Sequence, residues 1–211
     1  MDELQFFNPY AEIRHTANRL PHWQQEGAVY FLTFRLADSV PRNLQDQWAN
    51  EREGWLGFNP KPWTPESERE YHKRFSGAIE RWLDAGHGEC LLRRLDCADV
   101  VANTLRHFDG ERVGMIAFVV MPNHVHAVFV QNPAWPLETI VRSWKGFTAR
   151  QINKLLGRSG HFWQRDYFDR LVRDEQHFRN CVRYIRRNPT KAKLGAREFV
   201  LYESEIAWSI E

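Results

Sequence analysis

The sequence predicts an α+β fold in which an antiparallel sheet is backed by helices. Runs rich in β-branched and aromatic residues occur at 27–36, 112–120 and 124–130, and such runs are typical of strands. Segments with the apolar spacing of helices separate them. The 211 residues are 43% hydrophobic and 27% charged, as in a globular protein with one core. We therefore expect a single domain over 1–211, with its core at about 25–195.

The first strand of this fold is predicted at 27–36, and it ends in polar residues before Pro41. Residues 42–63 contain two glycines and two prolines, so we expect an excursion of short helix and loop there. Thr64-Pro65 then supplies a capping hydroxyl and a proline at the first helical position. The helix that starts there is expected to run to about Leu83 and to be closed by Gly86 or Gly88.

The middle of the chain predicts a helix and a hairpin. A helix is expected at 98–107, and Asp109-Gly110 then turns the chain. The strands at 112–120 and 124–130 are joined by Met121-Pro122-Asn123, so they form a hairpin. Residues 136–156 have helical spacing. The face expected to be apolar consists of Ile140, Trp144, Phe147 and Ile152.

The last two core elements are a strand at 167–172 and a helix. Asp174-Glu175 complements the dipole at the start of this helix. We expect it to stop at Asn188, before Pro189. The resulting order is strand, helices, strand, strand, helix, strand, helix, which is close to the ferredoxin-like split β-α-β arrangement. Residues 1–26 and 195–211 are expected to be extensions packed on the domain.

Several classes of protein are disfavoured by composition. No stretch approaches the roughly 20 apolar residues of a membrane span, and the start lacks the pattern of a secretion signal, so we expect a cytoplasmic protein. Its three cysteines show no Cys-x-x-Cys pairing. They are expected to be reduced structural residues rather than disulfides or zinc ligands.

The charge of the chain is unevenly distributed. The net charge is only +2, but 142–193 holds fourteen Lys and Arg against four Asp and Glu, which gives +10 and leaves −8 elsewhere. Such asymmetry indicates a polyanion-binding segment, with a solvated basic surface as the alternative. Basic residues of this segment are candidates for phosphate contacts, which position a nucleic acid without reading its sequence. They are Lys145, Arg150, Arg165, Arg170, Arg173, Arg183, Arg187 and Lys191.

His124-Val125-His126 is the strongest candidate for chemistry. Side chains alternate along a strand, so both imidazoles point to one face while Val125 points to the other. Neutral imidazole is a common ligand of divalent metals. The alternative is a pair of surface histidines after a turn.

Tyr184 and Asn188 form a second candidate pair. They are four residues apart on the last helix and so lie on one face, one turn from each other. A phenol beside a metal and a basic helix is a possible nucleophile for a phosphodiester, although its pKa near 10 means that attack needs help. Asn188 offers a carbonyl oxygen as a third ligand. The alternative is a core tyrosine and a helix-terminal asparagine, and Tyr167 is a rival nucleophile in a strand-like setting.

Two ordered motifs carry a family resemblance over roughly residues 10–195. Met121-Pro122-Asn123-His124-Val125-His126 and the later Tyr184-Ile185-Arg186-Arg187-Asn188-Pro189-Thr190-Lys191 together resemble the signature of the REP-associated tyrosine transposases, in the HUH single-tyrosine nuclease superfamily. Supporting segments lie at 22–35, 143–148 and 163–169. Relatives among the insertion-sequence transposases generally have Gln where this chain has Asn188, so the resemblance carries over less directly to that position.

The resemblance implies metal-dependent cleavage and rejoining of single-stranded DNA. By this resemblance, His124, His126 and the polar residue one turn after the tyrosine hold Mg²⁺ or Mn²⁺. Tyr184 forms a 5′-phosphotyrosine and releases a 3′-hydroxyl, which can later reverse the reaction. The implied substrate is a repetitive extragenic palindrome, a DNA hairpin preceded by a guide tetranucleotide. The implied protein is bacterial, associated with the nucleoid, and a monomer or homodimer.

Two other functions are compatible with the same residues. One is a catalytically silent protein that binds structured nucleic acid through the basic segment. The other is a conventional metal phosphodiesterase with water as nucleophile, which the sequence disfavours because no carboxylate cluster adjoins the histidines.

Overall fold

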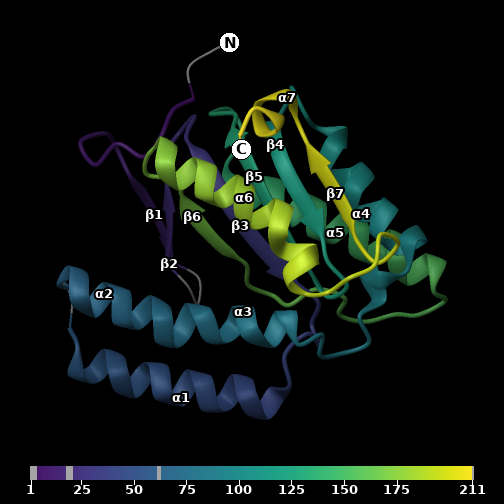
Figure 1. Cartoon of the computed structure of the whole chain (residues 1–211), viewed down its shortest axis with the longest axis horizontal. Coiled ribbons are helices and arrows are strands. Elements are labelled where there is room, and N and C mark those ends of the chain that lie inside the picture. The colour runs from purple at the N-terminus through teal and green to yellow at the C-terminus, as the bar shows by residue number, and fades with distance from the viewer. Residues whose placement is uncertain (1–3, 18–20, 61–62, 211) are drawn as a thin grey trace.

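The computed structural model describes residues 4–17, 21–60 and 63–210, and its centre is a five-stranded antiparallel sheet (Figure 1). The strand order is β6-β3-β5-β4-β7. If β3 to β6 are taken as four successive strands, they stand in the order fourth, first, third, second, as in the split β-α-β arrangement. The predicted fold class is therefore confirmed. The strands are β3 (Val29–Arg35), β4 (Val113–Val120), β5 (His124–Gln131), β6 (Phe168–Leu171) and β7 (Val200–Glu203).

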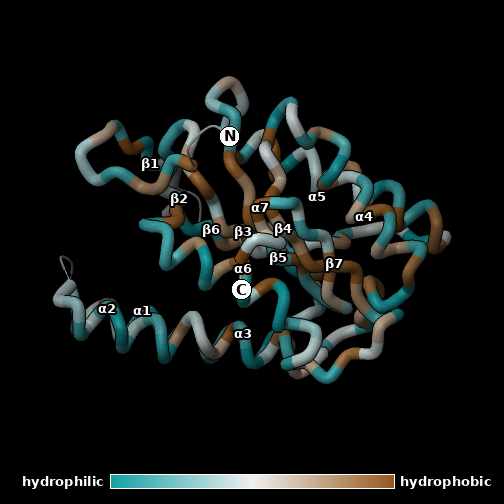
Figure 2. The backbone as a smooth tube through the Cα atoms, turned by 45° about the horizontal axis from the view of Figure 1, so that its top comes forward, coloured by the Kyte–Doolittle hydropathy of each residue, from teal (hydrophilic) through white to brown (hydrophobic). Residues whose placement is uncertain are grey.

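Helices cover both faces of the sheet. Helices α4 (Leu95–His107) and α5 (Leu137–Leu155) pack on one face, whereas α6 (Glu175–Lys191) and the short α7 (Glu205–Trp208) lie on the other (Figure 1). Hydrophobic stretches are concentrated in the central strands (Figure 2). Along β5, Val125 and Ala127 enter the core under α4 and α5, and Val128 enters the core under α6. The alternation places His124 and His126 on the α6 face.

A helical excursion, residues 42–84, follows β3 along the chain and projects from the sheet before the chain returns to form α4 and β4 (Figure 1). It contains α1 (Arg42–Phe58), α2 (Pro65–Tyr71), the π-helical turn η1 (His72–Ser76) and α3 (Gly77–Asp84). Thr64 caps α2 by accepting from the backbone N–H of Ser67, and Gly86, at φ +69°, follows α3, as predicted.

The expectation of short helix and loop at 42–63 was wrong, because 42–58 is one continuous helix. Each glycine costs a helix roughly 1 kcal/mol relative to alanine. Tertiary packing overrides this cost, since Trp55 on α1 contacts the rings of Trp63, Tyr71 and Phe75. An aromatic core of its own therefore holds the excursion together.

Three further details of the helices differ from the sequence prediction. Phe147 on α5 is 44% exposed, so it does not share the buried face of Ile140, Trp144 and Ile152. Helix α6 continues past Pro189 to Lys191. Proline lacks the N–H that would bond to the carbonyl four residues earlier, and its ring crowds that carbonyl. Pro189 is nevertheless buried on α6, so tertiary packing overrides the predicted break. Helix α4 also begins three residues earlier than predicted, after the short helix η2 (Leu91–Arg93).

The terminal extensions add elements that periodicity did not predict. A two-stranded sheet forms from β1 (Arg14–Ala17) and β2 (Pro21–Gln24), and β7 extends the main sheet beside β4. Arg186 of α6 ties down the C-terminal segment by pairing with Glu203 and donating to backbone carbonyls of α7 and beyond. The cysteines are free thiols, as expected. Within the described residues, no helix combines the length and apolarity that a membrane span needs.

Candidate active site

The two histidines lie side by side on β5. His124 is paired in register with Arg35 and His126 with Thr33 on the neighbouring strand β3. Their ring centroids are 4.6 Å apart, and the residues are only 1% and 2% exposed. The convergence predicted from the His-x-His spacing is thus present, and the surface-histidine alternative does not describe this pair.

Each imidazole is held through its Nδ1 atom. Nδ1 of His124 lies 2.7 Å from Oδ1 of Asn123, and Nδ1 of His126 lies 2.7 Å from the hydroxyl of Thr33. Contacts of this kind fix ring orientation and leave Nε2 as the free ligand atom in many metal sites. Nε2 of His124 is buried and makes no hydrogen bond within the described part of the chain.

Tyr184 reaches this pair from α6. Its hydroxyl lies 3.5 Å from Nε2 of His126, and its ring packs edge-on against that imidazole at 5.1 Å between centroids. Phe31 of β3 contacts both rings. One turn on, Asn188 is 1% exposed. Neither of its side-chain amide atoms makes a hydrogen bond to the described residues.

Burial sets the protonation of these groups. Desolvation lowers the pKa of His124 to about 3, and the Lys191 ammonium adds to this. Burial also lowers the pKa of His126 well below its usual value. It raises the pKa of Tyr184, as do the carboxylates of Glu80 and Asp84 on α3, while the nearby Asn188 amide opposes the rise without meeting hydrogen-bond geometry. At neutral pH the imidazoles are therefore neutral, and the phenol carries its proton.

The donor atoms fit a divalent cation. Buried polar atoms are normally satisfied by a partner, yet Nε2 of His124 and both amide atoms of Asn188 are not satisfied by the described residues. A cation bound by Nε2 of His124, Oδ1 of Asn188 and Nε2 of His126 would supply a partner for the first two of these atoms. In the described ranges, no group of three or more His, Cys, Asp or Glu side chains forms a metal cluster, so the available set is two imidazoles and an amide.

Tyr167 lies away from this arrangement. It packs against the core on the α4/α5 face of the sheet, and burial raises its pKa. Its ring lies 5.8 Å from Nζ of Lys145. The sheet separates Tyr167 from the histidines, so only Tyr184, of the two candidate tyrosines, lies beside them.

Of the eight predicted phosphate-binding residues, four arginines are at least partly exposed and three residues face carboxylates of the excursion. Arg150, Arg165 and Arg187 are exposed, and Arg183 is partly exposed. Arg170, Arg173 and Lys191 face carboxylates of the excursion: Arg173 pairs with Glu68 at 3.0 Å, Lys191 pairs with Asp84 at 2.7 Å, and Arg170 lies near Glu80.

Lys145, the eighth of the predicted phosphate-binding residues, contacts the protein's own backbone. Its Nζ donates to the backbone carbonyls of Gln164 and Arg165, at 2.8 and 2.7 Å. Burial lowers its pKa to about 8. The ammonium group holds the loop before β6, and its donors are turned toward that loop rather than toward a ligand.

Sequence reasoning missed the residues around the histidines. Thr33 was not found because its contact with His126 depends on strand register, which no local pattern reveals. Asn123 adjoins the motif, and a polar residue directly before a ligand pair was the available signal. Glu80 and Asp84 were missed because the docking of the excursion is not encoded in local periodicity.

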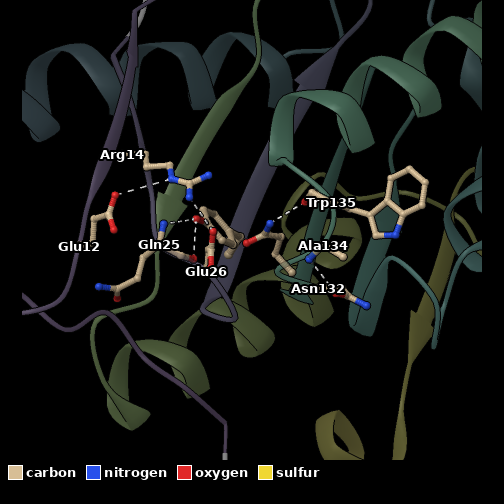
Figure 3. Close-up of polar contacts among 9 residues, drawn as sticks. Glu12, Arg14, Gln25, Glu26, Asn132, Ala134 and Trp135 are labelled. Atoms are coloured by element: carbon tan, nitrogen blue, oxygen red, sulfur yellow. Dashed lines mark hydrogen bonds and ion pairs between the residues drawn. The ribbon is translucent and has the colours of Figure 1, made fainter.

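Two hollows among the described residues lie away from the histidines. One, of about 230 Å³, is bordered by the N-terminal segment, the turn after β2 and the loop after β5. Figure 3 shows Arg14 between Glu12 and Glu26, at 3.9 and 3.0 Å, with Asn132, Ala134 and Trp135 across from them. A second hollow shares Glu26, Gln131 and Pro133 with it. Neither is lined by the histidines or Tyr184.

The part of the chain that contains the site is similar to known proteins. Residues 95–188 match the family model described as "Transposase IS200 like". The chain is also similar to a REP-associated tyrosine transposase bound to a REP hairpin, at 15% identity and a TM-score of 0.47, over 83% of this chain and 74% of that one. A transposase candidate from Deinococcus radiodurans gives 15% identity and a TM-score of 0.36, over 88% and 98% of the two chains. No curated protein matches the sequence.

The matched segment contains every residue of the His124, His126, Tyr184 and Asn188 arrangement. Segment 95–188 matches the IS200-like transposase model, and this match supports the resemblance drawn from the motifs. The excursion lies outside the match.

Proposed function

We propose that this protein is a transposase that acts as a metal-dependent single-stranded DNA endonuclease and strand transferase, with Tyr184 as its nucleophile. One observation supports this above all. The phenol of Tyr184 meets the buried histidine pair at 3.5 Å, and the unpartnered amide of Asn188 lies one helical turn away. A purely structural role for Tyr184 would leave Nε2 of His124 and Oδ1 of Asn188 buried beside it without a partner among the described residues.

The reaction proposed is a transesterification. The oxygen of Tyr184 attacks phosphorus, the bond from phosphorus to the 3′ oxygen breaks, the phenol loses its proton and the 3′ oxygen gains one. A bound Mg²⁺ or Mn²⁺ supplies electrophilic polarisation of the phosphate. His124, His126 and Asn188 would hold it, with both imidazoles kept neutral by burial. The phosphotyrosine keeps the energy of the broken bond, so rejoining needs no ATP.

We further propose that the substrate is a repetitive extragenic palindrome hairpin with a 5′ guide tetranucleotide. This rests on the motif resemblance of 121–126 and 184–191. The exposed cations Arg150, Arg165 and Arg187 are available for phosphate contacts. Their contribution would fall as salt rises, because each contact releases counterions.

The test uses Tyr184→Phe and oligonucleotides that carry palindromes from the DNA flanking the gene. With Mn²⁺, the wild-type protein should form a covalent adduct visible on a denaturing gel, and Tyr184→Phe should abolish it. Tyr167→Phe is the matched control and should retain the adduct. An adduct undiminished in Tyr184→Phe would refute the assignment. Tight hairpin binding without cleavage would favour the silent binder, and cleavage that persists in the variant would favour a water nucleophile.

A further inference from the structure

Asn123, directly before the histidine pair, links the excursion to one of the proposed metal ligands. It is 1% exposed. Its Oδ1 lies 2.7 Å from Nδ1 of His124, and its Nδ2 lies 3.2 Å from each of the backbone carbonyls of Leu83 and His87. Leu83 belongs to the last turn of α3, and His87 follows that helix.

These contacts determine which way the amide faces. Backbone carbonyls only accept hydrogen bonds, so the two that flank Asn123 require its NH₂ group. The carbonyl oxygen of the side chain must then face His124, where it accepts from Nδ1–H. A neutral imidazole with a proton on Nδ1 has a lone pair on Nε2. Nε2 is the buried, unpartnered atom that faces the proposed cation site.

The other histidine lacks this constraint. Thr33 holds Nδ1 of His126 through a hydroxyl, which either donates or accepts. Its contact therefore leaves both tautomers of His126 open. The Asn123 amide, by contrast, is fixed at both ends.

We propose that Asn123 is a positioning residue that sets the tautomer of His124, and that the end of α3 orients it. The tautomer follows from the contacts alone, whereas its role in metal binding rests on the proposed function. In this arrangement the excursion contributes to the geometry of the candidate site. Its last turn fixes the atom that His124 offers to the cation.

The test reads the tautomer directly, without metal or DNA. Long-range ¹H–¹⁵N NMR of the metal-free protein at neutral pH should show His124 with its proton on Nδ1. In Asn123→Leu, the form with the proton on Nε2 should become the major one. Asn123→Asp keeps an acceptor for Nδ1–H, and its second oxygen meets the Leu83 and His87 carbonyls as a protonated carboxyl, so this variant should retain the wild-type tautomer. Asn103→Leu, at an exposed asparagine on α4, is the control and should change nothing.

Mn²⁺ binding followed by electron paramagnetic resonance extends the test. Loss of such supporting contacts typically lowers metal affinity about 10–100-fold, and we expect this for Asn123→Leu. A wild-type His124 protonated on Nε2, or a tautomer unchanged in Asn123→Leu, would overturn the inference. If the tautomer shifts as expected but the wild-type protein binds no Mn²⁺, the positioning role stands and the proposed function fails.

Discussion

The sheet side and the helix side of the candidate site are held in different ways. On the sheet side, both histidines are buried and each Nδ1 has a partner, so the two rings are fixed before any ligand binds. On the helix side, Tyr184 is partly exposed and the Asn188 amide has no hydrogen bond to the described residues. A pair of oriented histidines therefore faces a helix on which the Asn188 amide has no hydrogen bond to the described residues, and variants on the two sides should behave differently.

The largest effect is expected on the sheet side. His126→Ala removes a proposed ligand and the imidazole that contacts Tyr184. Because metal polarisation contributes several kcal/mol to such reactions, the cleavage rate should fall roughly 10³-fold, and Mn²⁺ binding should weaken. Single-turnover cleavage of the hairpin strand measures the first effect and electron paramagnetic resonance the second. His107→Ala, at an exposed histidine of α4, is the control. Equal rates in the two variants would contradict a role for His126.

A change on the helix side should separate stability from activity. Asn188→Leu replaces a buried, unpartnered amide by an apolar group of similar size. Leaving such a group unsatisfied costs about 1–3 kcal/mol, so the free energy of unfolding in urea should rise without metal. Cleavage and Mn²⁺ affinity should fall. If Asn188→Leu destabilises the metal-free protein and leaves cleavage intact, Asn188 is a structural residue.

The same contrast explains how far sequence reasoning reached. The sheet side was predictable because alternation along one strand places His124 and His126 on one face, with no knowledge of neighbours. The spacing of Tyr184 and Asn188 likewise follows from one helix. Contacts made between elements were not predictable: Thr33 depends on the register of β3 with β5, and Asn123 on the docking of α3.

The excursion shows the same limit. Its glycines and prolines indicated loop, whereas the ring contacts of Trp55 stabilise a 17-residue helix. Phe147 matched the apolar spacing of α5 but is exposed, because spacing alone does not show how wide a face is covered. The +10 charge of 142–193 follows from the sequence alone. It did not show that Lys145 is bound to backbone carbonyls or that Lys191 is paired with Asp84.

The smallest effect is expected where the excursion meets the helix side. Asp84→Asn removes the charge that Lys191 pairs with at 2.7 Å. The Lys191 side chain is 53% exposed, and pairs of this kind are worth about 0–1 kcal/mol, so stability should change little. If Lys191 contacts phosphate, freeing it should tighten hairpin binding by up to about five-fold. Fluorescence anisotropy at two salt concentrations measures this, with the gain shrinking at higher salt. Glu66→Gln removes one charge from an exposed position on α2 and is the matched control. A gain of the same size in both variants would show a general loss of repulsion rather than release of Lys191.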